Sequence, residues 1–352
     1  MKTMSVAVFD KLNSIKIEQH PIPTVTNTTI LIKVDSCAIC TWEQRVFSGE
    51  KPVLFPFIGG HEIAGKIIAI GKDIQTNEWQ VGDKVVYGTN LACGHCYQCK
   101  SGNEQNCNNF NHSKQLPGLP YKGMGGLSSY LLVHPEHLFH YSNVSPEEAS
   151  LTEPLSCVIH SAESANIQYG DFVLIIGCGV MGLLHLQIAL KSGAFVILSD
   201  PDENRLVKAT NLGAHRVVNP AKENLNTIIN QLTNNQGVQI VFNTTPISKV
   251  AEENMDLIGN NGTHVLYSSF YPNLPIEIDP DKLHKKAIKL IGTANSNKTD
   301  FTKATRMISQ GLIQIKPLIS KVLPLSQVEE AFEIAPLKEN YRIVINFREE
   351  DE

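Results

Sequence analysis

The sequence predicts an α/β protein with two parts, one mainly β and one a doubly wound parallel sheet. In the first third of the chain, short runs of alternating apolar and polar residues stand between prolines and turn residues, which is typical of antiparallel strands. From Asp171 onward, apolar runs without alternation are followed by helix-length segments, which is typical of parallel strands buried on both faces. At 352 residues, the chain also exceeds the usual size of a single core.

Composition narrows the class of partner. The chain is 42% hydrophobic and 18% charged, with a formal net charge of -5, so no basic face for nucleic acid is expected and the partner is predicted to be a small molecule. The N-terminal residues lack the pattern of a secretory signal, which predicts a cytoplasmic protein. No apolar run approaches the roughly 18 to 20 residues that span a bilayer.

The mainly β part begins with alternating runs between Ser5 and Val34 and continues with strand patterns over residues 60–90. Residues 91–126 then form an aperiodic loop, and a loop of this length requires a function or a metal to order it. Beyond further strands, Ser145 and Glu148 have the spacing of an N-cap and its N3 partner around a first-turn proline, which predicts a helix start.

The α/β part carries a glycine motif. In VLIIGCGVMG, Gly177, Gly179 and Gly182 have GxGxxG spacing, directly after a predicted strand and at the start of a helix. In a Rossmann domain the first glycine permits a tight turn, the second lets the backbone approach a pyrophosphate, and the third lets the helix pack on the strand. The free amides and positive dipole of the helix N-terminus would bind the phosphates. The sequence therefore predicts a dinucleotide site.

Asp200 ends the next strand, where a carboxylate would accept hydrogen bonds from the adenosine ribose and repel a 2′-phosphate. NAD is therefore predicted over NADP, although Arg205 keeps NADP open because a nearby arginine can bind that phosphate. The predicted cofactor-binding residues are Gly177, Gly179, Val180, Met181, Gly182, Asp200, Arg205 and Thr244.

The long loop contains Cys93, Cys96, Cys99 and Cys107, in a chain without an export signal, where thiols stay reduced. Four thiolates without a carboxylate or histidine fit a closed, structural zinc site. An iron–sulfur cluster is the alternative, and the lack of a proline after the last cysteine weakens it.

A second predicted metal site has an open composition. Cys40, His61 and a carboxylate, either Glu62 or Glu153, would leave one position of a zinc ion for water or substrate. Cys40 or His61 alone is more often a core residue than a ligand. Their coincidence with a nucleotide motif favours a catalytic zinc, because a Lewis acid beside a nicotinamide ring suits alcohol oxidation.

These residues resemble the zinc-dependent medium-chain dehydrogenase family over essentially the whole chain. The stretch GHEIAGKIIAIGKDI at residues 60–74 is similar to the family's zinc signature, and the four-cysteine loop, GGLSSYLLV at 125–133 and the Rossmann unit follow in family order. LTEPLSCVIHSA at 151–162 and DPDENRL at 200–206 resemble the polyol branch, which includes sorbitol dehydrogenases.

The resemblance implies a GroES-like, mainly β catalytic domain at residues 1–153, completed by 293–352, and a Rossmann NAD-binding domain at 154–292. It also implies two zinc ions per chain, one catalytic and one structural, and a homodimer or homotetramer. The expected reaction is hydride transfer between NAD and a secondary alcohol, namely a polyol or sugar alcohol, with or without a phosphate group.

Departures from the family pattern concern the substrate. After its zinc cysteine the family usually has a Ser or Thr two residues on, where this chain has Trp42, so the usual hydroxyl for relaying the substrate proton is absent. Thr41, Glu43, Arg45 and a ribose hydroxyl of the nicotinamide half are alternative relay candidates, with a surface turn as the competing interpretation for Thr41 and Glu43. Arg45 could instead be a surface charge, a contact to a cofactor phosphate, or a grip on a phosphorylated sugar.

Two other functions remain open from the sequence. One is a threonine or short secondary-alcohol dehydrogenase on the same scaffold. The other is a catalytically inactive nucleotide-binding protein, which the presence of Cys40, His61, Glu62 and Glu153 together disfavours.

Overall fold

The computed structural model describes residues 2–75, 77–89 and 92–348. Within these residues, no helix is both long and apolar enough to cross a membrane.

The chain divides into two compact units. Met1–Ser156 and Ser296–Glu352 form the first, and Cys157–Asn295 forms the second. We call them the β-rich unit and the α/β unit. The sequence places the corresponding boundaries at 153/154 and 292/293.

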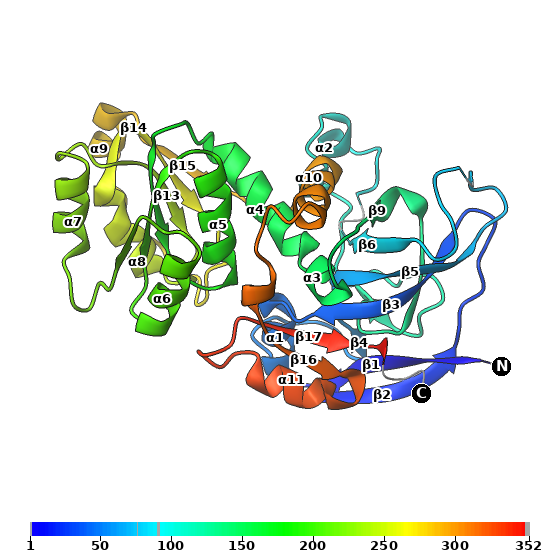
Figure 1. The fold of residues 1–352 in the computed structure, drawn as a ribbon. Helices are drawn as coiled ribbons and strands as arrows, with labels where there is room; N and C mark the ends of the chain where they lie inside the picture. The colour runs from blue at the N-terminus through cyan, green and yellow to red at the C-terminus, as the bar shows by residue number, and fades with distance from the viewer. Residues whose placement is uncertain (1, 76, 90–91, 349–352) are drawn as a thin grey trace. The chain divides into compact units, whose positions relative to one another are not determined.

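Two sheets form the β-rich unit. Its strands are β1 (Thr3–Lys11), β2 (Ser14–Pro21), β3 (Ile30–Ala38), β4 (Phe57–Ile58), β5 (Glu62–Ile70), β6 (Lys84–Gly88), β7 (Lys122–Gly123), β8 (Tyr130–Val133), β9 (Leu138–His140), β16 (Ile319–Pro324) and β17 (Arg342–Asn346). The larger sheet has the order β16-β17-β3-β5-β6-β9, with β8 also paired to β3, and the smaller has the order β2-β1-β4-β7. Strand β17 runs antiparallel to β3, with Val344 opposite Ala38. Figure 1 shows the red strand β17 beside the blue strand β3. The C-terminal segment therefore completes the N-terminal sheet.

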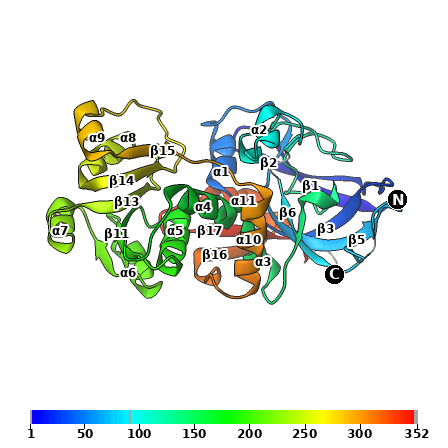
Figure 2. The same cartoon turned by 90° about the horizontal axis from the view of Figure 1, so that it is seen from above.

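Helices of the β-rich unit are short. They are α1 (Thr41–Ser48), α2 (Tyr97–Lys100), α3 (Pro146–Ser150), α10 (Lys298–Ser309) and α11 (Val328–Ile334), with 3₁₀ turns η1 (Glu104–Asn106), η2 (Pro135–His137), η4 (Lys316–Leu318) and η5 (Leu325–Gln327). The predicted start of α3 is confirmed, because Ser145 and Glu148 form a reciprocal capping box. Figures 1 and 2 both show α10 beside α3, and Phe301 of α10 packs on Phe139 with ring centroids 4.8 Å apart.

Aromatic packing joins distant segments in the core of this unit. The ring of Phe9 in β1 packs edge-on against Phe57 of β4 at 6.3 Å and Phe332 of α11 at 5.2 Å. Phe47 of α1 contacts both Phe9 and Phe332. Edge-to-face aromatic pairs add roughly 0.5–1.5 kcal/mol each beyond the area that they bury. Helix α1 is therefore fixed to the core on one side, which positions the residues that it contributes to the site.

The α/β unit contains one parallel sheet with the order β12-β11-β10-β13-β14-β15. Its strands are β10 (Phe172–Ile176), β11 (Phe195–Ser199), β12 (Arg216–Val218), β13 (Val238–Asn243), β14 (Ile258–Leu266) and β15 (Lys289–Gly292). Its helices are α5 (Val180–Lys191), α6 (Glu203–Asn211), α7 (Leu225–Leu232), α8 (Ser248–Glu253) and α9 (Pro280–Lys286), with the 3₁₀ turn η3 (Asn254–Leu257), while α4 (Thr152–Ala165) contains the unit boundary. Figure 1 shows α5 and α7 on opposite sides of the strands. The strand order reverses at β10, and in such sheets ligands bind at the carboxyl ends of the strands beside that point.

Candidate metal centres and cofactor site

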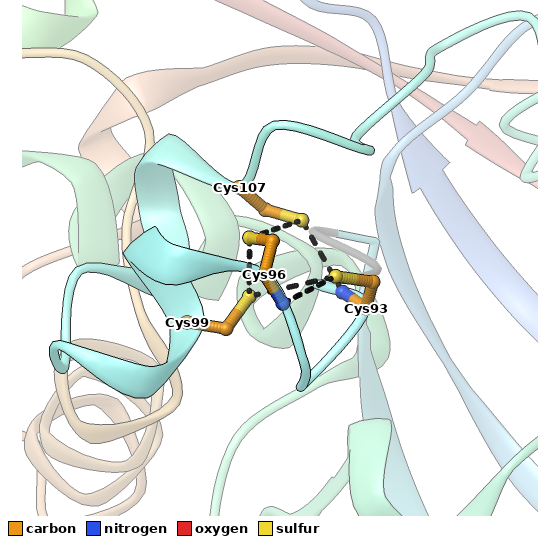
Figure 3. Close-up of side chains that lie close together, drawn as sticks. All are labelled: Cys93, Cys96, Cys99 and Cys107. Atoms are coloured by element: carbon orange, nitrogen blue, oxygen red, sulfur yellow. Dashed lines mark hydrogen bonds between the residues drawn. The ribbon is translucent and has the colours of Figure 1, made fainter.

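The four cysteines of the long loop converge on one point. Cys93 precedes α2, Cys96 is the N-cap of α2, Cys99 lies within it, and Cys107 ends the turn η1. Figure 3 shows their sulfur atoms facing one another, and all four lie within 4.8 Å of each other. None of the four forms a disulfide.

The spacing of these sulfurs fits a single tetrahedral zinc ion. The Sγ–Sγ distances are 3.5 Å for Cys96–Cys99, 3.9 Å for Cys96–Cys107 and 4.0 Å for Cys93–Cys99. A zinc–sulfur bond of about 2.3 Å places tetrahedral ligands roughly 3.8 Å apart. Four sulfurs this close leave no room for a cluster of several irons and sulfides, so the structure supports the zinc interpretation over the iron–sulfur alternative.

Hydrogen-bond donors around the cysteines stabilise thiolates. Cys93 Sγ accepts from Asn109 Nδ2 at 3.2 Å and from the Cys96 amide at 3.4 Å, while Cys107 Sγ accepts from the Cys93 amide at 3.3 Å. The Asn109 side chain and the neighbouring backbone amides lower the pKa of Cys93 to about 5. Zinc binds the thiolate form, so these donors favour metal binding.

A second group of metal ligands lies where a helix and a strand begin. Cys40 is the N-cap of α1, His61 immediately precedes β5, and Glu62 is its first residue. One ligand atom from each lies within 4.8 Å of the others. Gly60 has φ +91°, and a Cβ there would lie 2.7 Å from the Leu127 amide nitrogen, so the chain can enter this turn only with glycine.

Glu43 orients the imidazole of His61. His61 Nδ1 lies 2.5 Å from Glu43 Oε1, which also accepts from the Gly60 amide at 3.1 Å. Since a carboxylate accepts, Nδ1 carries a hydrogen, and in the neutral ring the lone pair of Nε2 is left for a metal. Nε2 lies 3.9 Å from Glu153 Oε2 on α4.

The field at His61 strongly favours positive charge. Burial alone lowers the pKa of His61, but the negative charges of Glu43 and Cys40 outweigh it and raise the pKa well above its usual value. A cation at Nε2 would meet the same negative surroundings. The site thus attracts a metal ion, although binding must displace a proton from the ring.

Arg342 of β17 holds the carboxylate of Glu62. Its Nε donates to Glu62 Oε2 at 2.9 Å and its Nη2 donates to Oε1, in a bidentate pair that is buried on both sides. Burial raises the pKa of Glu62 to about 7, against the opposing effect of Arg342. Breaking such a buried pair typically costs about 3–5 kcal/mol.

The donor set of this second centre fits zinc with an open position. Cys40, His61 and one carboxylate make three protein ligands, the number at a catalytic zinc. Two ligands about 2.0–2.2 Å from a tetrahedral zinc lie roughly 3.3–3.6 Å apart, and His61 Nε2 and Glu153 Oε2 are 3.9 Å apart. Both Glu62 and Glu153 are thus within reach, and Glu62 already has Arg342 as a partner.

Aromatic rings border this centre. The indole of Trp42 meets the His61 ring edge-on at 6.4 Å between centroids, and it stacks on the ring of His112 at 5.0 Å. Phe57 also packs against Trp42, with ring centroids 5.9 Å apart. Trp42 remains partly exposed, so it packs on the core and also offers ring surface beside the metal ligands.

In the α/β unit, the glycine turn has the geometry that its sequence requires. Gly177 has φ +100°, and a Cβ on Gly182 would lie 1.8 Å from the Gly177 carbonyl oxygen, so α5 packs tightly on the turn. Thr244 Oγ1 donates to the Ile176 carbonyl at 2.7 Å and so holds the residue that precedes the glycine turn. A Cβ on Gly179 would meet a single neighbour, Arg205 Nη1 at 3.8 Å. The backbone at Gly179 is therefore open to an approaching phosphate.

Asp200 lies just beyond β11, beside this turn. Its Oδ2 accepts from the Cys178 amide at 2.7 Å and its Oδ1 accepts from the Asp202 amide at 2.9 Å. These bonds fix the carboxylate next to the glycine turn, as the ribose of a dinucleotide requires. The guanidinium of Arg205 reaches the same turn.

Comparison with known proteins identifies the family. Residues 26–143 match the family model of the alcohol dehydrogenase GroES-like domain, and residues 180–310 match that of the zinc-binding dehydrogenases. The chain belongs to the zinc-containing medium-chain dehydrogenases. It is an NAD(P)-dependent alcohol dehydrogenase that acts on CH–OH donors, and its two ligand groups are a structural and a catalytic zinc site.

Relatives of this dehydrogenase differ in substrate. It is 31% identical to a D-arabitol-phosphate dehydrogenase of Enterococcus avium, over 89% of this chain and 88% of the relative. It is 28% identical to an L-galactonate-5-dehydrogenase of Escherichia coli over 99% and 98%, and 26% identical to a sorbitol dehydrogenase of Halalkalibacterium halodurans over 94% of each. A crystal structure of an E. coli oxidoreductase of unknown specificity superposes with a TM-score of 0.89 at 26% identity, covering 98% of this chain and 99% of that one.

The predicted relay residues of the dehydrogenase all lie on α1 and differ in exposure. Thr41 is exposed at the start of α1, and Arg45 lies 3.6 Å from Glu50 through Nε and Oε2. The surface turn considered for Glu43 is wrong, because Glu43 lies on helix α1 and is only 1% exposed. The sequence indicated that helix poorly, since Thr, Trp and a buried Glu do not form an apolar stripe.

Two residues near the catalytic centre are absent from the predicted set. Arg342 is the lone charge in the apolar run RIVIN, and a charge inside a buried strand is itself a signal of a buried partner. Lys51, whose ammonium lies over Trp42, gave no such signal, because a lysine after a Gly-Glu turn looks like a surface residue.

Proposed function

We propose that this enzyme oxidises a secondary hydroxyl of a polyol or sugar alcohol and transfers the hydride to NAD+. The observation that carries the proposal is the catalytic ligand set, in which Cys40, His61 and a Glu62 held by Arg342 surround one point. The resemblance of residues 151–162 to the polyol branch supports the substrate class. The names of the relatives that act on arabitol phosphate, sorbitol and galactonate support it too.

Residues of the β-rich unit would bind and orient the alcohol. When bound there, zinc makes a coordinated hydroxyl more acidic, and NAD+ accepts the hydride. Glu43 keeps the Nδ1 hydrogen of His61 in place, so that Nε2 stays directed at the ion. Trp42 offers ring surface along which the carbon chain of a polyol can lie.

We assign different roles to the three carboxylates at this centre, those of Glu62, Glu153 and Glu43. Glu62, paired with Arg342, keeps its charge compensated, whereas Glu153 Oε2 faces the free Nε2 of His61. We therefore propose that Glu153 would supply the carboxylate ligand to a bound zinc and that Glu62 would be a second carboxylate within reach. Because Glu43 is buried behind His61, we assign it to positioning, and the proton leaves by another route.

For the cofactor, we propose that Gly177, Gly179 and Gly182 with the start of α5 bind the pyrophosphate and that Asp200 binds the adenosine ribose. Arg205 Nη1 lies beside Gly179, which supports a contact to a cofactor phosphate and keeps NADP as the alternative cofactor.

We also propose that the enzyme acts in the cytoplasm as a homodimer or homotetramer. Light scattering coupled to size-exclusion chromatography tests the oligomeric state.

A substrate panel tests the function. The zinc-loaded enzyme is assayed at NADH absorbance with pentitols, hexitols, their phosphates, aldonic acids, L-threonine and 2,3-butanediol, each with NAD+ and NADP+. We expect the highest kcat/KM among the polyol derivatives with NAD+. Preference for threonine would replace the polyol proposal by an amino-alcohol dehydrogenase, and absence of turnover with every alcohol would overturn it.

A further inference from the structure

A lysine ammonium lies over an indole ring beside the catalytic centre. Lys51 follows α1 by a short turn, where its amide donates to the Arg45 carbonyl at 2.9 Å. Its Nζ lies 5.8 Å from the ring centroid of Trp42, and its side chain is partly buried. Within the described parts of the chain, Lys51 forms no salt bridge, whereas the neighbouring Arg45 faces Glu50 at 3.6 Å.

The distance between Lys51 and the metal ligands has an upper limit, because the Trp42 ring contacts both Lys51 and His61. Trp42 contacts both the Lys51 ammonium, at 5.8 Å, and the His61 imidazole, at 6.4 Å between centroids. At most about 12 Å can therefore separate Nζ from the imidazole centroid. An extended carbon chain advances roughly 1.3 Å per bond, given a C–C bond of about 1.5 Å. Five or six carbons with a terminal acidic group can thus bridge from the metal to Lys51 along Trp42.

The charge of Lys51 lacks compensation where it lies. Burial and the positive charge of Arg45 lower the pKa of Lys51, and the negative charges of Cys40 and Glu43 offset this only in part. An ammonium that is partly removed from water gains from an anion, and its contact with the indole face substitutes for that anion only weakly. A neutral polyol would leave the ammonium in this state.

We propose that Lys51 binds an anionic group, a phosphate or a carboxylate, at the end of the polyol remote from the oxidised hydroxyl. This inference rests on the proposed function and narrows its substrate class to acidic polyols. The hydroxyl occupies the metal centre, the carbon chain lies along Trp42, and the acidic end reaches Lys51. Lys51 is a specificity residue in this arrangement, and the chemistry of hydride transfer is left to the metal centre and the cofactor.

The test compares acidic and neutral substrates across matched variants. Steady-state kinetics with NAD+ are measured for D-arabitol and D-arabitol 5-phosphate, and for galactitol and L-galactonate, in wild type, Lys51→Met, Lys51→Arg and Lys72→Met. Lys72 is an exposed lysine outside the site and controls for loss of a surface charge. The phosphate and carboxylate pairs identify which acidic group is bound.

We expect wild type to prefer the acidic member of at least one pair. Lys51→Met should lose roughly 10- to 100-fold in kcat/KM for that substrate, mostly through KM, as expected for a lost charged hydrogen bond. The neutral polyol should change less than about threefold, Lys51→Arg should retain most of the preference, and Lys72→Met should match wild type.

Other results overturn the inference. An equal loss for neutral and acidic substrates would make Lys51 structural, and a raised KM for NAD+ alone would assign it to a cofactor phosphate. A wild-type enzyme that oxidises neutral polyols and discriminates against both acidic series would refute Lys51 as an anion site while leaving the proposed function intact. Absence of any alcohol oxidation would instead refute the proposed function.

Discussion

The two metal centres of this dehydrogenase are built on opposite plans. The four-cysteine centre takes all its ligands from one loop, between Cys93 and Cys107. The catalytic centre takes residues from the starts of α1, β5 and α4, and its Glu62–Arg342 pair spans 280 positions of the chain. A local centre stabilises its own loop, whereas a long-range centre depends on the whole β-rich unit. The difference separates a structural from a catalytic role, and each part of it can be tested.

The largest effect is expected on activity at the long-range centre. Cys40→Ser replaces a thiolate by a poor zinc ligand, so kcat/KM should fall by roughly 10³-fold or more. Metal analysis should show zinc falling from two ions per chain to one, while the melting temperature changes by less than about 2 °C. Near-wild-type turnover with one zinc per chain would remove Cys40 from the catalytic centre.

At the local centre, the main effect should be on stability. Cys99→Ser should abolish zinc binding at the four-cysteine centre and leave a long loop without its crosslink. A loss of about 3 kcal/mol would lower the melting temperature by roughly 6 to 12 °C. Turnover per remaining folded molecule, measured well below the new midpoint, should stay within about threefold of wild type. A large loss of turnover without loss of stability would mean that the two centres are not separated in role.

The pH dependence of the metal-free protein sharpens the contrast. The pKa of Glu62 is raised to about 7 from 4.5, so the folded state binds more protons than the unfolded state between these values. The stabilisation by Glu62 is present below pH 4.5 and is lost as pH rises through 7, a change on the order of 3 kcal/mol. The raised pKa of His61 acts in the same direction.

Urea unfolding in chelator at pH 5, 6 and 7.5 measures this change. Wild type should lose stability over that range more steeply than Glu62→Gln, which cannot titrate there. Parallel pH profiles for the two proteins would mean that the Glu62–Arg342 pair keeps the carboxylate ionised throughout. The four-cysteine centre contributes equally to the unfolding free energy of both proteins, so it does not affect the difference between their pH profiles.

The smallest effect is expected from the residue that orients a ligand. Glu43→Gln keeps the shape at His61 but replaces the acceptor by an amide, and such changes typically cost about 10- to 100-fold in metal affinity or activity. The loss should appear as zinc released from the catalytic centre at lower chelator concentration, with the four-cysteine centre unchanged. If chelator removes both ions from Glu43→Gln at the wild-type concentration, Glu43 does not act through His61.

The same contrast explains what the sequence could predict. The cysteine spacing, the glycine turn and the Ser145–Glu148 cap are local, so chain geometry alone relates their residues. The partnership of Glu62 with Arg342 depends on β17 completing the sheet beside β3, and no local rule links residues so far apart. The sequence does not single out Lys51 for a related reason. Its place beside the catalytic centre depends on its contact with the Trp42 ring, and its neighbours in sequence do not indicate that contact.

The pairing of Glu62 with Arg342 also has a consequence for biosynthesis. At a translation rate of about 5–20 residues per second, the 280 positions between them take the ribosome roughly 15 to 60 s. During that interval the Arg342 partner of Glu62 has not yet been synthesised, and the edge of β3 that β17 will cover is unpaired. The nascent chain can complete its four-cysteine centre early, but the catalytic centre lacks the Arg342 partner of Glu62 until the last strand arrives, and an uncovered strand edge can pair with other chains in the meantime.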